Sequence, residues 1–183
     1  MARRPLVAFT STSRIGILNV LANTCSVGAC VPPSGAAPLP PHAFKAIWDT
    51  GATNCAIAQS VVDTCGLVAT GMTQVHGVHG DRIVETFLVN IVLPNRVTFE
   101  QVRVTKGELV GGDILIGMDI ISQGDFAVSN FGGVTQFTFR YPSQVAADYV
   151  QEAETQEAIA NRPPSPKVVR RKTPKTYGQH KKK

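Results

Sequence analysis

The stretch Ile47-Trp48-Asp49-Thr50-Gly51-Ala52-Thr53 constrains the fold more than any other part of the chain. Apolar residues run directly into Asp-Thr-Gly, and two small residues follow. This pattern predicts a buried strand, from Ala43 to Trp48, that delivers a carboxylate to a tight turn. The bare tripeptide also occurs in surface turns, but the apolar approach to it argues against an exposed turn.

A second unusual segment, Ile114-Leu115-Ile116-Gly117-Met118-Asp119, lies further along the chain. Its continuous apolar run predicts a fully buried strand. Gly117 permits a turn into a short helix, which we expect over Asp119–Gln123 with Gly124 as its stop. On its own, the segment also occurs as an ordinary buried strand followed by a helix.

Together the two segments resemble the retropepsin-like (retroviral-type) aspartic proteases. Gly-Met-Asp is closer to the cellular and bacterial members, which carry one Asp-Thr-Gly motif in each chain. The resemblance covers residues 15–142 and implies an all-β acid-protease fold with a short helix or two. One chain forms one lobe, so the fold is expected to close by homodimerisation.

The resemblance implies Asp49 as the catalytic residue of each chain, with Thr50, Gly51 and Ala52 as active-site support. Two facing carboxylates share one proton, and the ionised one takes a proton from water. The implied activity is hydrolysis of peptide bonds in extended, apolar-flanked polypeptide segments, without a cofactor. The alternative is a catalytically silent peptide-binding or scaffold module of the same fold.

A β-hairpin with arms Thr73–Val78 and Ile83–Leu93 occupies the position of the family's flap, which closes over substrate. The substrate-binding residues that the resemblance implies lie on this flap and in the cleft: Gly77, Val78, Gly80, Ile116 and Gly117. His76 and His79 lack a third ligand in the sequence, so we expect no metal site.

The chain departs from the retroviral pattern at one pair of positions. Retroviral enzymes commonly carry Arg after the second Gly, paired with an acidic residue after the catalytic motif. Here Met118 replaces the Arg, and Thr53 and Asn54 replace the acidic positions. We expect Asp119 to be a helix-start or structural residue and not a catalyst.

The remaining elements are predicted from local patterns. We expect a strand at Ile15–Leu21, a helix at Ala58–Cys65 capped by Gly66, and a strand at Val97–Thr105 with a bulge between positions 99 and 102. A last hairpin is predicted from Ala127–Asn130 and Thr135–Arg140. Its Phe residues are expected in the core and the interface.

Both ends of the chain differ from its middle. Residues 1–14 show no clear periodicity and are expected to be partly disordered, whereas 143–160 predicts a weakly amphipathic helix. Nine of the 18 basic residues and no acidic residue lie in 161–183, which leaves residues 1–160 with a net charge of −4. We expect this basic tail to be disordered and to contact nucleic acid or an anionic surface only non-specifically.

Four cysteines, Cys25, Cys30, Cys55 and Cys65, show no metal-binding spacing. We expect reduced thiols in a cytoplasmic protein, with a Cys25–Cys30 disulfide as the alternative. The sequence Val27-Gly28-Ala29-Cys30 resembles a bacterial lipoprotein cleavage box, so export is the alternative localisation. No apolar run approaches the roughly 20 residues of a membrane span.

Overall fold

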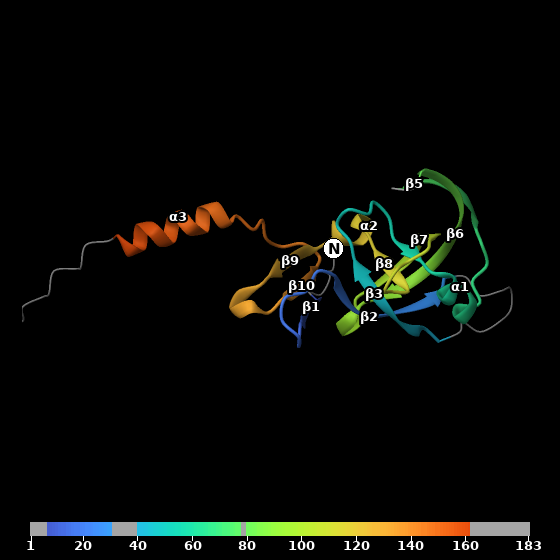
Figure 1. Cartoon of the computed structure of the whole chain (residues 1–183), viewed down its shortest axis with the longest axis horizontal. Helices are drawn as coiled ribbons and strands as arrows, with labels where there is room; N and C mark the ends of the chain where they lie inside the picture. Colours follow the sequence, from blue (N-terminus) through green and yellow to red (C-terminus); the bar gives the residue numbers. More distant parts are fainter. Residues whose placement is uncertain (1–6, 31–39, 78–79, 162–183) are drawn as a thin grey trace, which may run out of the picture. The chain divides into compact units, whose positions relative to one another are not determined.

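The computed structural model describes residues 7–30, 40–77 and 80–161 and consists mainly of β-strands (Figure 1). It divides into a body that extends to Val145 and a second unit that begins at Ala146. The described part of the second unit contains one helix, α3 (Tyr149–Ala160), whose residues are all exposed. The Asp148 carboxylate caps this helix by accepting hydrogen bonds from the backbone N–H groups of Val150 and Gln151.

A seven-stranded sheet forms most of the body, in the order β2-β3-β8-β4-β7-β6-β5. An additional pairing joins β2 to β6, so that six of the strands close into a small barrel and β5 lies outside it on β6. The strands are β2 (Leu21–Ala29), β3 (His42–Trp48), β4 (Ala56–Ile57), β5 (Gly71–Gly77), β6 (Gly80–Val92), β7 (Thr98–Lys106) and β8 (Ile114–Ile116).

A second, three-stranded antiparallel sheet has the order β1-β10-β9, formed by β1 (Val7–Thr12), β9 (Asp125–Ser129) and β10 (Gln136–Tyr141). Aromatic side chains join it to the barrel. The Trp48 indole on β3 stacks on the Phe126 ring at 5.3 Å and also contacts Phe9, Phe137 and Phe139. Because Trp48 immediately precedes Asp49, this cluster supports the strand that carries the carboxylate.

The helices of the body are short. They are α1 (Gln59–Cys65), η1 (Pro94–Arg96), α2 (Met118–Ile121) and η2 (Phe131–Gly133). Gly66 ends α1 with φ of 58° in the left-handed region, as expected from the sequence. The β8 strand and the bulge in β7 are also confirmed, the latter as a register shift opposite Val89 and Ile91.

The predicted strand at Ile15–Leu21 is wrong. The strand of this region is β2, which begins at Leu21 and continues to Ala29. Ile15 and Ile17 are exposed, and Gly16 lies at φ of 101°, which ends the extended conformation there. The polar residues inside β2 are tolerated because its alternate residues Cys25 and Val27 face the core.

The expectation of disorder over residues 1–14 is also corrected for the part that the structure describes. Val7–Thr12 forms β1, which pairs with β10 over its whole length. Only Phe9 of this strand is buried, so its alternation is too weak to predict a strand locally. Its strand partner comes more than a hundred residues later, and that pairing is invisible in a local sequence window.

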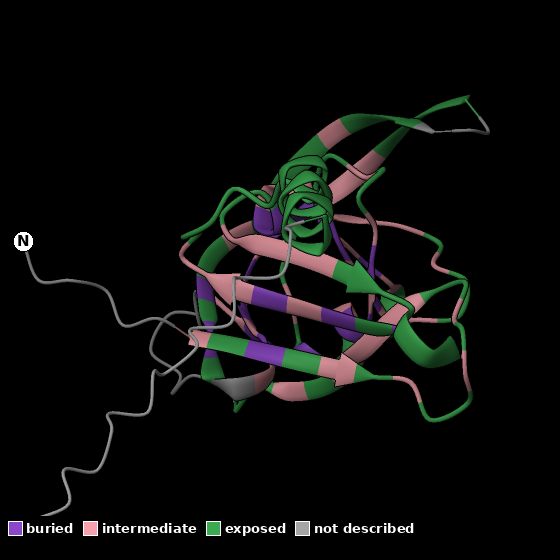
Figure 2. Ribbon diagram, turned by 90° about the vertical axis from the view of Figure 1, so that its left-hand side faces the viewer, coloured by how far each residue is buried: buried purple, intermediate pink, exposed green. Residues whose placement is uncertain are grey.

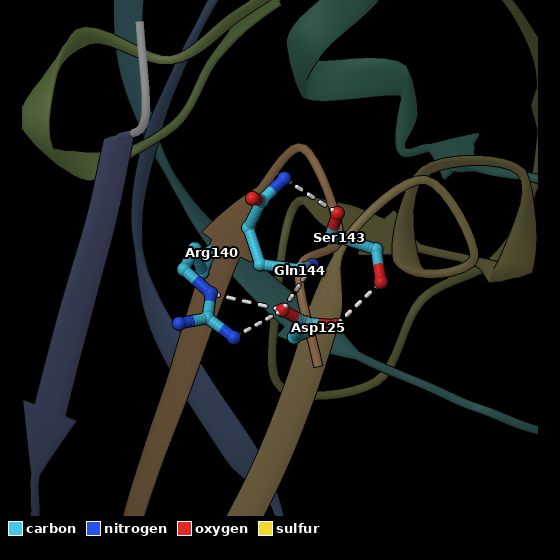
Figure 3. A network of polar contacts seen from close by, with 4 residues as sticks. All are labelled: Asp125, Arg140, Ser143 and Gln144. Carbon is cyan, nitrogen blue, oxygen red and sulfur yellow. Dashed lines mark hydrogen bonds and ion pairs between the residues drawn. The ribbon is translucent and has the colours of Figure 1, made fainter. Parts of the chain in front are cut away.

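The carboxylate of Asp125 holds the end of the second sheet (Figure 3). It accepts hydrogen bonds from the Arg140 guanidinium, from the Ser143 hydroxyl and from the backbone N–H of Gln144. These hydrogen bonds, and the positive charge of Arg140, hold the pKa of the Asp125 carboxyl well below its usual range. The network ties β9, β10 and the following residues together at their shared end.

All four cysteines are free thiols, so the alternative disulfide is not formed. Burial raises the pKa of Cys25 to about 12 and that of Cys65 above its usual value. Val27, from the lipoprotein-like sequence, is fully buried inside β2. Within the described ranges, no helix is long and apolar enough to cross a membrane.

Candidate active site

The loop that carries Asp49 leaves the sheet from β3 and returns to it as β4. Both flanking strands pair with the same short strand, β8: Trp48 lies opposite Ile116 in parallel register, and Ala56 lies opposite Leu115 in antiparallel register. The backbone N–H of Asp49 donates to the carbonyl of Ile116 at 3.0 Å. The loop is therefore fixed at both ends to one buried element.

Hydrogen bonds within the loop orient the carboxylate. The backbone N–H of Gly51 donates to Asp49 Oδ1 at 2.8 Å, and the Ala52 N–H donates to the Asp49 carbonyl at 3.3 Å. A Cβ atom at Gly51 would lie only 3.2 Å from Oδ1, which favours glycine there. Asp49 is half-buried, whereas Thr50 and Gly51 are exposed, so the loop presents the carboxylate at the surface of one chain.

The second sequence motif packs against this loop from below. The backbone N–H of Met118 donates to the Ala52 carbonyl at 2.8 Å, and that of Asp119 donates to the Thr53 carbonyl at 3.1 Å. A Cβ atom at Gly117 would lie 2.6 Å from the carbonyl carbon of Asn54. Only glycine allows the two backbones to approach this closely.

Asp119 is a structural residue, as expected. Its carboxylate accepts from the Cys55 N–H at 2.9 Å, from the Cys55 thiol at 3.0 Å and from the Ile120 N–H at 3.0 Å. The Gly117 N–H in turn donates to Cys55 Sγ at 3.3 Å. Burial, followed by the hydrogen bond to Asp119 and its charge, raises the pKa of Cys55, so the thiol stays protonated and can donate.

The role of Cys55 cannot be predicted from the sequence, because nothing in its local sequence shows that it lies against Asp119. A buried cysteine that follows an Asp-Thr-Gly motif by a few residues is not a recognised sequence signal for a hydrogen bond to a carboxylate. Its proximity to Asp119 becomes visible only when β4 and α2 are brought together by β8. The hydrogen bonds between Cys55 and Asp119 join the end of the Asp49 loop to α2.

The expected cleft residues fall into two groups. Gly77 and Gly80 pair with each other at the outer end of the β5–β6 hairpin, and Val78 lies outside the described residues. Ile116 is fully buried and Gly117 is packed against Asn54, so neither lines an open surface. Both residues support the loop, because β8 turns Ile116 inward and the half-buried Leu115 outward. Their role in substrate binding stays a prediction.

The His76 imidazole on the hairpin contacts a carboxylate instead of a cluster of ligands. Its Nδ1 lies 2.6 Å from Asp81 Oδ1, and the Gln74 amide donates to the other oxygen at 2.9 Å. Among the residues that the structure describes, no group of three His, Cys, Asp or Glu side chains could hold a metal ion. His79 lies outside them.

One protein-family model matches the part of the chain that contains this site. The family model described as "gag-polyprotein putative aspartyl protease" matches residues 41–123, a range that contains both the Asp49 loop and the turn at Gly117. No curated protein sequence matches the chain.

Two solved structures are similar to the chain at low identity. A retropepsin-like aspartic protease from Rickettsia conorii shares 12% identity, covering 77% of this chain and 99% of that one, with a TM-score of 0.48. The simian foamy virus (mac) protease shares 15% identity, covering 55% of this chain and 92% of that one, with a TM-score of 0.36.

The all-β fold with short helices that the sequence predicts is confirmed, and so is the resemblance on which it was based. The Asp-Thr-Gly loop, the strand that holds both of its ends and the glycine beneath it all lie within the matched range. The match of residues 41–123 to the gag-polyprotein aspartyl protease model supports the resemblance of the chain to the retropepsin-like aspartic proteases.

Proposed function

We propose that the chain is a homodimeric aspartic endopeptidase in which Asp49 of each of two chains activates water. The observation that carries the proposal is the half-buried Asp49 carboxylate on a loop fixed at both ends to β8. Within the described residues of one chain, the Gly51 N–H is the hydrogen-bond donor to Oδ1, and Oδ2 has no partner. That oxygen is free to face a second carboxylate or a bound water.

The chemistry needs both carboxylates. Two carboxyl groups at hydrogen-bond distance cannot both ionise, so they share one proton and titrate as a pair. The ionised member removes a proton from water, which attacks the scissile carbonyl while the protonated member donates a hydrogen bond to its oxygen. The resulting tetrahedral intermediate collapses when the leaving amine is protonated. No covalent bond to the enzyme forms at any step.

The three-stranded sheet supports association with a second copy. Its outer strands, β1 and β9, each have one unpaired edge among the described residues, and Thr50 of the loop is exposed. The loop after β1 lies against the β9–β10 turn, since the Thr135 N–H donates to the Gly16 carbonyl. Large apolar side chains are exposed on these two segments: Ile15 at 86%, Ile17 at 64% and Phe131 at 94%. Such a group of exposed apolar residues is typical of a protein–protein interface.

The proposed substrate is an extended polypeptide with apolar residues beside the cleaved bond. Ile47, Leu115 and Ala56 lie opposite one another on β3, β8 and β4, and all three are half-buried. They form an apolar floor next to Asp49. The β5–β6 hairpin projects from the barrel with its outer part exposed, which suits it to be a flap over this floor (Figure 2).

Incubation of the wild-type protein and Asp49→Asn with a mixed peptide library between pH 4 and 7, read by mass spectrometry, tests the proposal. We expect cuts from the wild type alone, blocked by a statine-type inhibitor. A well-folded dimer that binds peptides but yields no product over days would contradict the proposal and favour a silent binding module. Sedimentation of both proteins checks that Asp49→Asn is still a dimer.

Two further proposals concern the localisation of the protein and the role of its basic C-terminal segment. We propose cytoplasmic localisation and a basic segment, residues 161–183, that contacts nucleic acid or an anionic surface non-specifically; 162–183 lie outside the described residues. Deletion of 162–183 is expected to abolish any binding to heparin or RNA without changing peptide cleavage. Sequence-specific binding that survives the deletion would contradict this assignment.

A further inference from the structure

A pocket of about 570 Å³ lies between the β5–β6 hairpin and the barrel. Its apolar lining comes from Ala56 on β4 and from Val75 and Val84 on the hairpin. Its polar lining differs from that of a purely apolar subsite, because it includes the side chains of Gln59, Arg82 and Glu108. The pocket is therefore built to receive a side chain that has an apolar stem and a polar end.

Strand pairing sets the distance of this pocket from Asp49. Ile47 lies opposite Leu115, which lies opposite Ala56, and Asp49 follows Ile47 by two residues, just beyond the end of β3. Two strand spacings of roughly 4.8 Å put Ala56 about 10 Å from Ile47, and the two further residues put it about 12 Å from Asp49. An extended peptide rises about 3.4 Å per residue, so the pocket would serve the third or fourth residue from the cleaved bond.

The hairpin directs Arg82 to the same side. Val75 lies opposite Arg82 in the β5–β6 register, and Thr73 lies opposite Val84. Paired residues share a face, so Val75, Arg82 and Val84 all line the pocket, while their neighbours His76, Asp81 and Ile83 point to the other face. Arg82 therefore approaches the pocket from above the apolar floor.

The charges around the pocket leave Arg82 weakly paired. Its guanidinium lies 3.8 Å from the Glu108 carboxylate, and the Glu108 side chain is 93% exposed. The second cation, Lys106, is held by a close ion pair with Glu85. The Gln59 amide nitrogen already donates to Asp63 at 2.9 Å. Of the two cations that line the pocket, Arg82 is therefore the one best able to form an ion pair with a substrate carboxylate.

We propose that this pocket is a specificity subsite that takes a glutamate side chain of the substrate, with its carboxylate on the Arg82 guanidinium. The inference rests on the proposed endopeptidase function and adds an acidic residue, three or four positions from the cleaved bond, to its substrate class. The apolar stem of glutamate packs on Val75 and Val84. Lysine at the same position is disfavoured by Arg82.

The test uses one peptide that the wild type cleaves, varied at the third and fourth positions on each side of the cut to Glu, Gln, Leu and Lys. At the responsive position we expect kcat/KM for Glu to exceed that for Lys by about fivefold or more, the effect of a partly exposed charge pair. Equal rates for Glu and Lys at every position, or a preference for Lys, would overturn the proposal.

Charge reversal identifies the residue responsible. Arg82→Glu is expected to invert the ranking, so that the Lys peptide is cleaved faster than the Glu peptide. The matched control is Arg103→Glu, another exposed arginine, on β7, that does not line the pocket, and it should keep the wild-type ranking. An unchanged ranking in Arg82→Glu contradicts the assignment.

A binding measurement separates this inference from the proposed function. Fluorescence anisotropy with labelled peptides and the Asp49→Asn protein measures the Glu over Lys preference without turnover. If the wild type cleaves nothing yet Asp49→Asn binds the Glu peptides more tightly, and Arg82→Glu in that background removes the preference, the endopeptidase proposal fails and the subsite stands. If cleavage occurs without any such preference in binding or rate, the subsite fails alone.

Discussion

The Asp49 loop and the β5–β6 hairpin are held very differently. The loop is bonded to β8 at both ends and to Met118 and Asp119 beneath it. The hairpin strand β5 pairs with β6 alone, at the edge of the sheet. Of its outer half, Val75, His76 and Ile83 are all exposed.

In the proposed endopeptidase, this contrast would separate two demands of catalysis. A reacting carboxylate must be held within a fraction of an ångström, which requires buried, hydrogen-bonded support. A segment that covers substrate must open, and low local contact density permits this at little energetic cost. Substitutions in the loop support are therefore expected to reduce stability and activity together, whereas those in the outer hairpin should spare stability.

The largest effect is expected from Gly117→Ala. The added Cβ would lie 2.6 Å from the Asn54 carbonyl carbon and 3.0 Å from the Ala52 carbonyl oxygen, so the loop must shift. We expect a loss of roughly 3 kcal/mol in the free energy of unfolding, measured with urea, and loss of peptide cleavage. The matched hairpin variant, Gly71→Ala, meets only Thr86 Oγ1 at 3.4 Å and should change stability by less than about 1 kcal/mol. Similar losses from both would break the comparison.

A smaller effect is expected from Asp119→Asn. The amide cannot accept hydrogen bonds from Cys55 and Ile120 through both oxygens, so we expect a loss of about 2 kcal/mol and a reduced kcat. The hairpin control is Asp81→Asn, whose carboxylate contacts Gln74 and His76 among the described residues, at an exposed site. Its cost should stay below about 0.5 kcal/mol. A larger loss from Asp81→Asn than from Asp119→Asn would contradict the assigned roles.

The smallest effect is expected from Asp125→Asn, and it concerns how the stability of the body, away from the hairpin, depends on pH. Because the folded-state pKa of Asp125 is depressed, its contribution to stability is present above the unfolded pKa of about 4 and is lost as the pH falls below it. We expect the stability difference between the wild type and Asp125→Asn to be constant from pH 7 to 5 and to shrink below pH 4. Urea midpoints measured across this range check it, and a difference that grows in acid would contradict the sign.

The parts of the fold that the sequence predicts well are those with strong local patterns. The approach to Asp49, the apolar β8 and the Gly66 cap each depend on residues within a few positions of one another. The β1 strand depends on β10, more than a hundred residues later, and the start of β2 depends on its pairing with Trp48. Local alternation therefore missed the first strand and misplaced the second. The register of a sheet decides which side chains face inward.

The same distinction applies to the site. Asp49 and Gly117 are recognisable from their motifs, whereas the Cys55–Asp119 contact requires β4 and α2 to meet in space. The inward orientation of Ile116 follows from its pairing with Trp48, which the apolar run alone does not specify. Arg82 has no motif, and only the β5–β6 register brings it to the pocket.

The most direct test of the account is a subunit-mixing measurement with wild type and Asp49→Asn at equal concentrations, after exchange has reached equilibrium. If each active site needs one Asp49 from each of two chains, only about a quarter of the dimers contain two wild-type chains. The account predicts that the cleavage rate per wild-type chain falls to about half of its value without the variant. An unchanged rate per wild-type chain would show that one Asp49 is sufficient and would contradict the two-carboxylate mechanism.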